Sequence, residues 1–161
     1  MLEEQVSDLL SKRGLSIAFA ESCTGGLVSH RITNVPGSSK YYLGSVVSYS
    51  NEVKNRLLLV RQETLENFGA VSHQCATEMA KGVRNLIGSD IGVAITGILG
   101  PGGSTIEKPV GLVYISLSSK DSVDYKKFKF NKSRIENKNS TADAALNMLL
   151  AYLKTSHTKD S

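Results

Sequence analysis

Residues 16–34, which read SIAFAESCTGGLVSHRITN, decide the fold. The first six, Ser16 to Glu21, form a short apolar run that predicts a buried strand. The turn Ser22-Cys-Thr-Gly-Gly26 follows, and the mixed apolar pattern after it predicts a helix that reaches about Asn34. A strand, a glycine turn and a helix in this order are typical of an α/β domain.

The remaining elements follow from the same kinds of pattern on both sides of this unit. Apolar residues at helical spacing predict helices before Gly14, after a cap at Asn51, over 72–87 with a cap at Ser72, and over 135–153. Apolar or alternating runs predict strands over 41–49, 90–96, 110–118 and 123–130, the last an edge strand or a half-exposed one. This order of elements predicts a three-layer α/β/α sandwich with a mixed sheet.

The length and composition are those of one globular domain. The chain has 161 residues, of which 40% are hydrophobic and 21% charged, and a domain of this size needs no disulfide or metal for stability. We expect a single domain over residues 1–154 and a polar tail over 155–161.

The sequence favours a cytoplasmic location and no membrane association. The two cysteines, Cys23 and Cys75, have no C-x-x-C spacing and are expected to be reduced. The N-terminus carries acidic residues where a signal peptide carries Lys or Arg, and no apolar run approaches the ~18 residues of a membrane span.

The formal net charge of +4 raises the question of nucleic-acid binding. Basic residues gather between Lys126 and Lys138 and alternate with Phe128 and Phe130, which could stack on bases. An edge strand with its aromatic rings turned inward and its lysines turned outward explains the same pattern. We therefore expect no nucleic-acid partner.

Standard catalytic and cofactor motifs are not met. The segment Gly97-Ile-Leu-Gly-Pro-Gly102 has the first spacing of a P-loop, but Gly103 stands where the lysine is required. The three histidines have no cysteine or carboxylate at metal-ligand spacing, and no G-x-S-x-G elbow is present. We expect no metal and no cofactor. What remains is a group of small polar residues at the predicted strand ends, which suits a ligand crevice.

Four of these segments carry a resemblance to a known family: 20–26 (AESCTGG), 49–54 (YSNEVK), 69–72 (GAVS) and 96–111, which contains TGILGPGG and EKPVG. The chain resembles the CinA C-terminal domain family over about residues 4–153, in its stand-alone form. The resemblance implies a nicotinamide-nucleotide amidase. Such an enzyme deamidates nicotinamide mononucleotide to nicotinic acid mononucleotide and ammonia in pyridine nucleotide salvage. It also implies a homo-oligomer and a serine–lysine mechanism without metal.

The resemblance implies the catalytic residues as well. It places the nucleophile in Gly37-Ser38-Ser39, with Ser39 as the first candidate and Ser38 as the other, Lys54 as the base and Tyr49 beside them. A serine hydroxyl needs a neighbour that takes its proton, and a neutral lysine can do so. If Asn51 caps a helix, Lys54 lies in the first turn, where the helix dipole disfavours the ammonium form. On spacing alone, Lys54 is better interpreted as a solvated helix lysine, and only the resemblance favours the catalytic role.

The residues implied to bind the substrate are Ser22, Thr24, Gly25, Thr96, Gly97 and Arg134. The helix end at Thr24 is expected to offer its amides to the phosphate. Thr96 and the glycine loop after it are expected to hold the carboxamide or its oxyanion. Arg134 is expected to pair with the phosphate. The chain departs from the family pattern at Lys132-Ser133, where Gly-Asp is usual, and at Leu99, where alanine is usual.

These departures motivate an alternative of a different class. The chain could be a catalytically silent ligand-binding domain of the same fold, with a regulatory or competence-associated role. Ammonia release in the presence of nicotinamide mononucleotide distinguishes the two readings.

Overall fold

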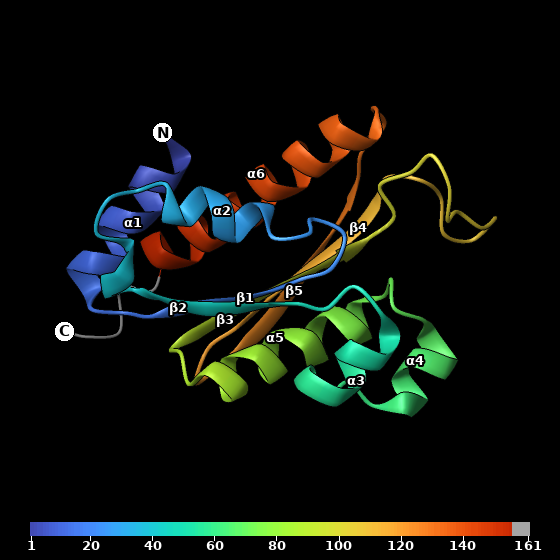
Figure 1. The fold of residues 1–161 in the computed structure, drawn as a ribbon, viewed down its shortest axis with the longest axis horizontal. Coiled ribbons are helices and arrows are strands. Elements are labelled where there is room, and N and C mark those ends of the chain that lie inside the picture. The colour runs from blue at the N-terminus through green and yellow to red at the C-terminus, as the bar shows by residue number, and fades with distance from the viewer. Residues whose placement is uncertain (156–161) are drawn as a thin grey trace.

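The computed structural model describes residues 1–155 and contains a five-stranded sheet between two layers of helices (Figure 1). The strands are β1 (Ile17–Glu21), β2 (Tyr42–Val47), β3 (Ile91–Gly97), β4 (Leu112–Ser118) and β5 (Val123–Lys129). Their spatial order is β2-β1-β3-β4-β5, with β1 parallel to β2 and β3 and the last two pairings antiparallel. The predicted mixed sheet in an α/β/α sandwich is confirmed.

Three helices cover each face of the sheet. One layer contains α1 (Leu2–Arg13), α2 (Leu27–Thr33) and α6 (Arg134–Thr155), and the other contains α3 (Asn51–Leu58), α4 (Gln62–Phe68) and α5 (His73–Ile87) (Figure 1). Helix α4 and the 3-10 turn η1 (Ser38–Lys40) are not among the elements predicted from the sequence. Of the predicted tail, Thr155 belongs to α6 and residues 156–161 lie outside the described part of the chain. No helix among the described residues is long and apolar enough to cross a lipid bilayer.

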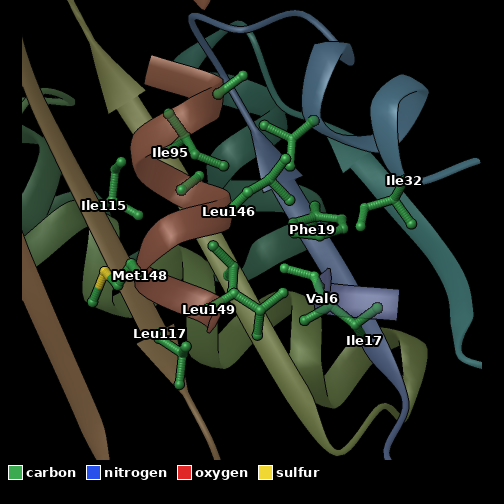
Figure 2. Close-up of a cluster of buried hydrophobic side chains, with 14 of the residues drawn as sticks. Val6, Ile17, Phe19, Ile32, Ile95, Ile115, Leu117, Leu146, Met148 and Leu149 are labelled. Atoms are coloured by element: carbon green, nitrogen blue, oxygen red, sulfur yellow. The ribbon is translucent and has the colours of Figure 1, made fainter. Parts of the chain in front are cut away.

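The two faces of the sheet bury side chains of different sizes. Towards α6, large residues such as Phe19, Ile95 and Ile115 pack against Leu146 and Leu149 (Figure 2). Burying each such side chain contributes about 1.5–3 kcal/mol. Towards α5 the strands present the small residues Ala18, Ala20, Gly92 and Ala94. A Cβ atom at Gly92 would lie 2.4 Å from the Ala80 carbonyl oxygen, so the small residues let α5 lie close to the sheet.

The helix ends agree with the predicted caps in two of three cases. Gly14 ends α1 in the left-handed conformation, and the Ser72 hydroxyl accepts a hydrogen bond from the Cys75 amide at the start of α5. The predicted cap at Asn51 is wrong by one residue, because Ser50 caps α3 by accepting from the Val53 amide.

The carboxyl ends of the three parallel strands meet at one edge of the sheet. Glu21 at the end of β1 pairs with Val47 of β2 and with Ile95 of β3. The antiparallel strand β4 begins at the same edge, where Val113 lies opposite Gly97. The residues that follow these strands are therefore neighbours, at the place where open α/β sheets bind ligands.

Candidate active site

The amine of Lys54 lies at the centre of this edge. Lys54 is in the first turn of α3 and is 1% exposed. Its Nζ lies 3.0 Å from Ser22 Oγ, 2.8 Å from the Ser48 carbonyl oxygen and 3.1 Å from the Tyr49 carbonyl oxygen. Within residues 1–155, no carboxylate forms an ion pair with this amine. The alternative of a solvated helix lysine is therefore wrong.

The surroundings of Lys54 favour its uncharged form. Burial lowers the pKa of the Lys54 amine below its ordinary value, and the amino end of α3 acts in the same direction. An uncharged amine has two N–H donors and one lone pair. The two carbonyl oxygens can only accept, so they take the two N–H groups. The lone pair is then left to accept the proton of the Ser22 hydroxyl.

Glu21 fixes the turn that presents Ser22. Its carboxylate is fully buried and accepts four hydrogen bonds, from Thr24 Oγ1 at 2.7 Å, the Val28 amide at 2.9 Å, the Ser29 amide at 3.0 Å and Ser29 Oγ at 2.6 Å. This carboxylate therefore occupies the amino end of α2. The predicted phosphate site at Thr24 is wrong, because Glu21 already takes the amides that the phosphate would need. The cap residue of α2 is Gly26.

A pocket of about 170 Å³ opens beside Ser22. Its lining residues come from four separate segments and are Ser22, Cys23, Tyr49, Gly97, Ile98, Leu99, Gly102, Gly103 and Arg134. The structure thus brings together four predicted residues: Ser22, Tyr49, Gly97 and Arg134. Larger hollows lie between α6 and β5 and between α3 and α5, but the residues that line them include no serine–lysine pair in contact.

Arg134 is the one charged side chain among the lining residues of this pocket. It is the first residue of α6, and its Nη1 donates to the Gly100 carbonyl at 2.7 Å while its Nη2 donates to the Tyr49 hydroxyl at 3.3 Å. A guanidinium has five N–H donors, so Arg134 retains donors for an anion at the mouth of the pocket.

The predicted pairing of Ser39 with Lys54 is wrong. Ser39 is exposed in η1, before β2 begins, whereas Lys54 follows the end of β2. The six residues of β2, at about 3.3 Å each, place these two ends about 20 Å apart. Ser38, the other candidate, lies in the same turn. Ser22, expected only to bind the substrate, is the serine that contacts the Lys54 amine.

Three predicted binding residues do not line the pocket. Thr96 is 1% exposed and donates its hydroxyl hydrogen bond to the Ala70 carbonyl at 2.9 Å, which ties β3 to the segment before α5. Thr24 donates to Glu21, and Gly25 is an exposed turn residue with a φ of 60°. Thr24 and Thr96 therefore support the turns around the pocket, and the carboxamide role expected of Thr96 is corrected.

Asn137, which is not among the residues predicted from the sequence, supports the opposite wall of the pocket. It is fully buried, and its Nδ2 donates to the Leu99 and Lys132 carbonyls at 3.0 and 3.1 Å. Its Oδ1 accepts from the Lys132 amide at 3.0 Å. Asn137 thereby fixes the start of α6, which carries Arg134, to the glycine loop. A buried asparagine has no sequence signal beyond its position in an otherwise apolar stripe.

The basic strand β5 is an edge strand, as predicted. Phe128 and Phe130 stack on each other at 5.9 Å between ring centroids and pack, half-buried, against the core. Their inward position supports the edge-strand interpretation of this segment. The absence of a nucleic-acid partner stays a prediction.

The fold and the pocket together define an α/β domain with a serine–lysine pair at the carboxyl ends of its parallel strands. The family model "CinA C-terminal domain" matches residues 1–153, so the chain belongs to the CinA family.

Relatives and solved structures agree with this assignment. The chain is 56% identical over 133 residues to a CinA-like protein of Dictyoglomus thermophilum, covering 83% of this chain and 32% of that protein. It is 48% identical over 159 residues to a CinA-like protein of Chloroherpeton thalassium, covering 96% of this chain and 38% of that protein. The chain thus spans about a third of the length of these relatives.

Among solved structures, the competence damage-inducible protein A of Klebsiella pneumoniae is similar with a TM-score of 0.93 and 32% identity, covering 96% of each chain. The competence/damage inducible protein of Agrobacterium tumefaciens is similar with a TM-score of 0.90 and 38% identity, also covering 96% of each chain.

Proposed function

We propose that the protein is an amidohydrolase that converts nicotinamide mononucleotide to nicotinic acid mononucleotide and ammonia, with Ser22 as nucleophile and Lys54 as base. The observation that carries the proposal is the contact of the buried Lys54 amine with Ser22 Oγ and two carbonyl oxygens. Family membership supports the substrate, because the sequence motifs resemble those of nicotinamide-nucleotide amidases.

The acylation step uses this contact directly. Ser22 Oγ attacks the carboxamide carbon while its proton passes to Lys54 Nζ. The resulting tetrahedral intermediate breaks its C–N bond as the Lys54 ammonium gives a proton to the leaving nitrogen, which departs as ammonia. The nicotinoyl group is then an ester of Ser22.

Deacylation repeats these proton transfers with water as the nucleophile. Water attacks the ester carbonyl, and Lys54 takes its proton and returns it to Ser22 Oγ as the ester bond breaks. The carboxylic acid product leaves and loses its proton to water, and the serine and the uncharged amine are restored. One amide and one water yield one carboxylic acid and one ammonia.

The pocket accommodates the pyridine end of the substrate, and its mouth accommodates the phosphate end. A volume of about 170 Å³ is below the roughly 300–1,000 Å³ of sites that enclose a drug-sized ligand, so it fits the pyridine ring and its carboxamide. The ribose and phosphate extend to the mouth, where Arg134 offers a bidentate partner. Backbone amides of the lining glycines Gly97, Gly102 and Gly103 are donors of the kind that stabilise an oxyanion.

The test is ammonia release from nicotinamide mononucleotide by the purified protein. We expect Ser22→Ala to lower the rate at least about 10³-fold, and the matched variant Ser39→Ala to leave it unchanged. Free nicotinamide should be a much poorer substrate, since it offers no phosphate to Arg134. A wild-type protein that releases no ammonia favours the silent ligand-binding domain, and an active Ser22→Ala variant rejects the assigned nucleophile.

A further inference from the structure

Tyr49 is hydrogen-bonded to both ends of the pocket. Its hydroxyl accepts from Arg134 Nη2 at 3.3 Å, and its backbone carbonyl accepts from Lys54 Nζ at 3.1 Å. The first contact is at the mouth, where an anion would bind, and the second is at the proposed base. Tyr49 therefore joins the anion-binding group to the group that must take the serine proton.

The side chain of Tyr49 is largely exposed, while hydrogen bonds fix the backbone amide of Ser48 and the side chain of Ser50 on either side of it. Ser48 is fully buried and its amide donates to the Glu21 carbonyl at 2.8 Å, while the Ser50 side chain caps α3. The Tyr49 side chain is 63% exposed, and the 3.3 Å contact with Arg134 is long for a hydrogen bond. Anything that fixes Arg134 will therefore also restrict Tyr49.

A phosphate at the mouth would fix Arg134. The guanidinium is the one charged group that lines the pocket, and it keeps donors beyond those used by Gly100 and Tyr49. Bidentate binding sets the plane of a guanidinium. Hydrogen bonds that are long in a free enzyme commonly shorten in its substrate complex, and the contact between Arg134 and Tyr49 is such a bond.

We infer that an anion bound at Arg134 acts through Tyr49 to hold the Lys54 amine in its proton-accepting geometry. The phosphate of the substrate then increases the rate of the chemical step as well as the affinity. Tyr49 is a positioning residue in this scheme. The inference rests on the proposed function for its substrate, and it predicts that a free oxyanion activates the enzyme towards a substrate that lacks a phosphate.

The first test measures deamidation of nicotinamide riboside with and without inorganic phosphite, at constant ionic strength. The quantity compared is the stimulation factor, the ratio of the two rates for each variant. We expect at least about fivefold stimulation of the wild type. Arg134→Ala and Tyr49→Phe should each give a factor close to one. Arg56→Ala, which removes an exposed arginine of α3 paired with Glu52, is the matched control and should keep the wild-type factor.

The second test needs no nucleotide. A fluorophosphonate phosphonylates an activated serine: the Ser22 Oγ–P bond forms, the P–F bond breaks, fluoride ion leaves into solvent, and the serine proton passes to Lys54. Phosphite should accelerate this labelling in the wild type and in Arg56→Ala, but not in Arg134→Ala or Tyr49→Phe. The labelling rate is read by intact-protein mass spectrometry.

The two tests separate the inference from the proposed function. A protein that deamidates nicotinamide mononucleotide but shows no phosphite effect on either rate overturns the inference and keeps the function. A protein with no deamidase activity whose Ser22 labelling is accelerated by phosphite overturns the function and keeps the coupling. Equal stimulation of wild type and Tyr49→Phe overturns the role of Tyr49.

Discussion

Replacing Glu21 with glutamine tests the buried carboxylate that shapes the Ser22 turn. Glutamine retains one carbonyl oxygen, which can accept the bonds now made by one carboxylate oxygen. Its NH₂ group must then face the two donors that now bond to the other carboxylate oxygen. In one orientation these are Thr24 Oγ1 and the Val28 amide, and in the other they are Ser29 Oγ and the Ser29 amide. A hydroxyl can rotate and accept instead, but a backbone N–H cannot.

The loss of folding free energy in Glu21→Gln follows from this count of donors. In either orientation of the glutamine, one backbone N–H loses its acceptor, the buried amide of Val28 or the part-buried amide of Ser29, and the remaining bonds lose the assistance of the negative charge. Together these losses should destabilise the fold by about 2–4 kcal/mol. For a domain of this size, the melting temperature should fall by about 5–15 °C.

The assay is thermal unfolding followed by circular dichroism, with Glu52→Gln as the matched control. Glu52 is an exposed residue of α3 that pairs with Arg56 at 3.2 Å, so its substitution should change stability by less than about 1 kcal/mol. A Glu21→Gln protein that melts within 2 °C of wild type, on the order of 1 kcal/mol or less, would refute the role assigned to the carboxylate.

Three further predictions follow from the geometry. The pKa of Lys54 is lower in the folded than in the unfolded protein, so at pH values between these two pKa values the unfolded chain binds more protons. Stability relative to Lys54→Met, measured by urea titration, should therefore rise with pH in that window. The kcat/KM of deamidation, measured as a pH–rate profile, should rise through the same lowered pKa. Gly82→Ala should destabilise the fold by about 1–3 kcal/mol, because its Cβ would lie 2.0 Å from the Leu58 carbonyl oxygen, whereas Gly102→Ala meets no atom within 4 Å and serves as control in urea unfolding. Burial raises the pKa of Cys23 to about 12 and that of Cys75 to about 11, so neither thiol should react with iodoacetamide at pH 8 until the protein unfolds, and fast alkylation of the native protein would contradict this.

The main elements could be predicted from the sequence because their signals are local. The run at Ile91–Gly97 is apolar on both faces, and Ser72 and Gly14 have the chemistry of a cap and a stop. The helix Gln62–Phe68 has seven residues, of which Thr64 and Leu65 are buried, so it leaves too short an apolar pattern to be found. Its position comes from packing against α5 and not from its own sequence.

The candidate site could be predicted only in part, because it depends on which strand ends meet. The sequence motifs predict Lys54, Tyr49 and Arg134, and the structure brings all three to one edge. The motifs predict the wrong serine, because two polar turns each offer a candidate. The direction of the strands is the signal that separates the two serines. Ser22 follows β1 and Lys54 follows the parallel strand β2, so both lie at the carboxyl ends, whereas Ser39 precedes β2 and lies at its amino end. Contacts such as Asn137 with Leu99 join residues far apart in the chain and have no local signature.

The central claim is that the Lys54 amine is uncharged beside Ser22 in the folded protein. The most direct measurement is a pH titration of ¹⁵N-labelled lysine Nζ and ¹³Cε signals by NMR, with the Lys54 resonance assigned by its loss in Lys54→Met. We expect one lysine that titrates clearly below the others and whose chemical shift changes in Ser22→Ala. A Lys54 signal that titrates with the exposed lysines, and that is the same with and without the Ser22 hydroxyl, would contradict it.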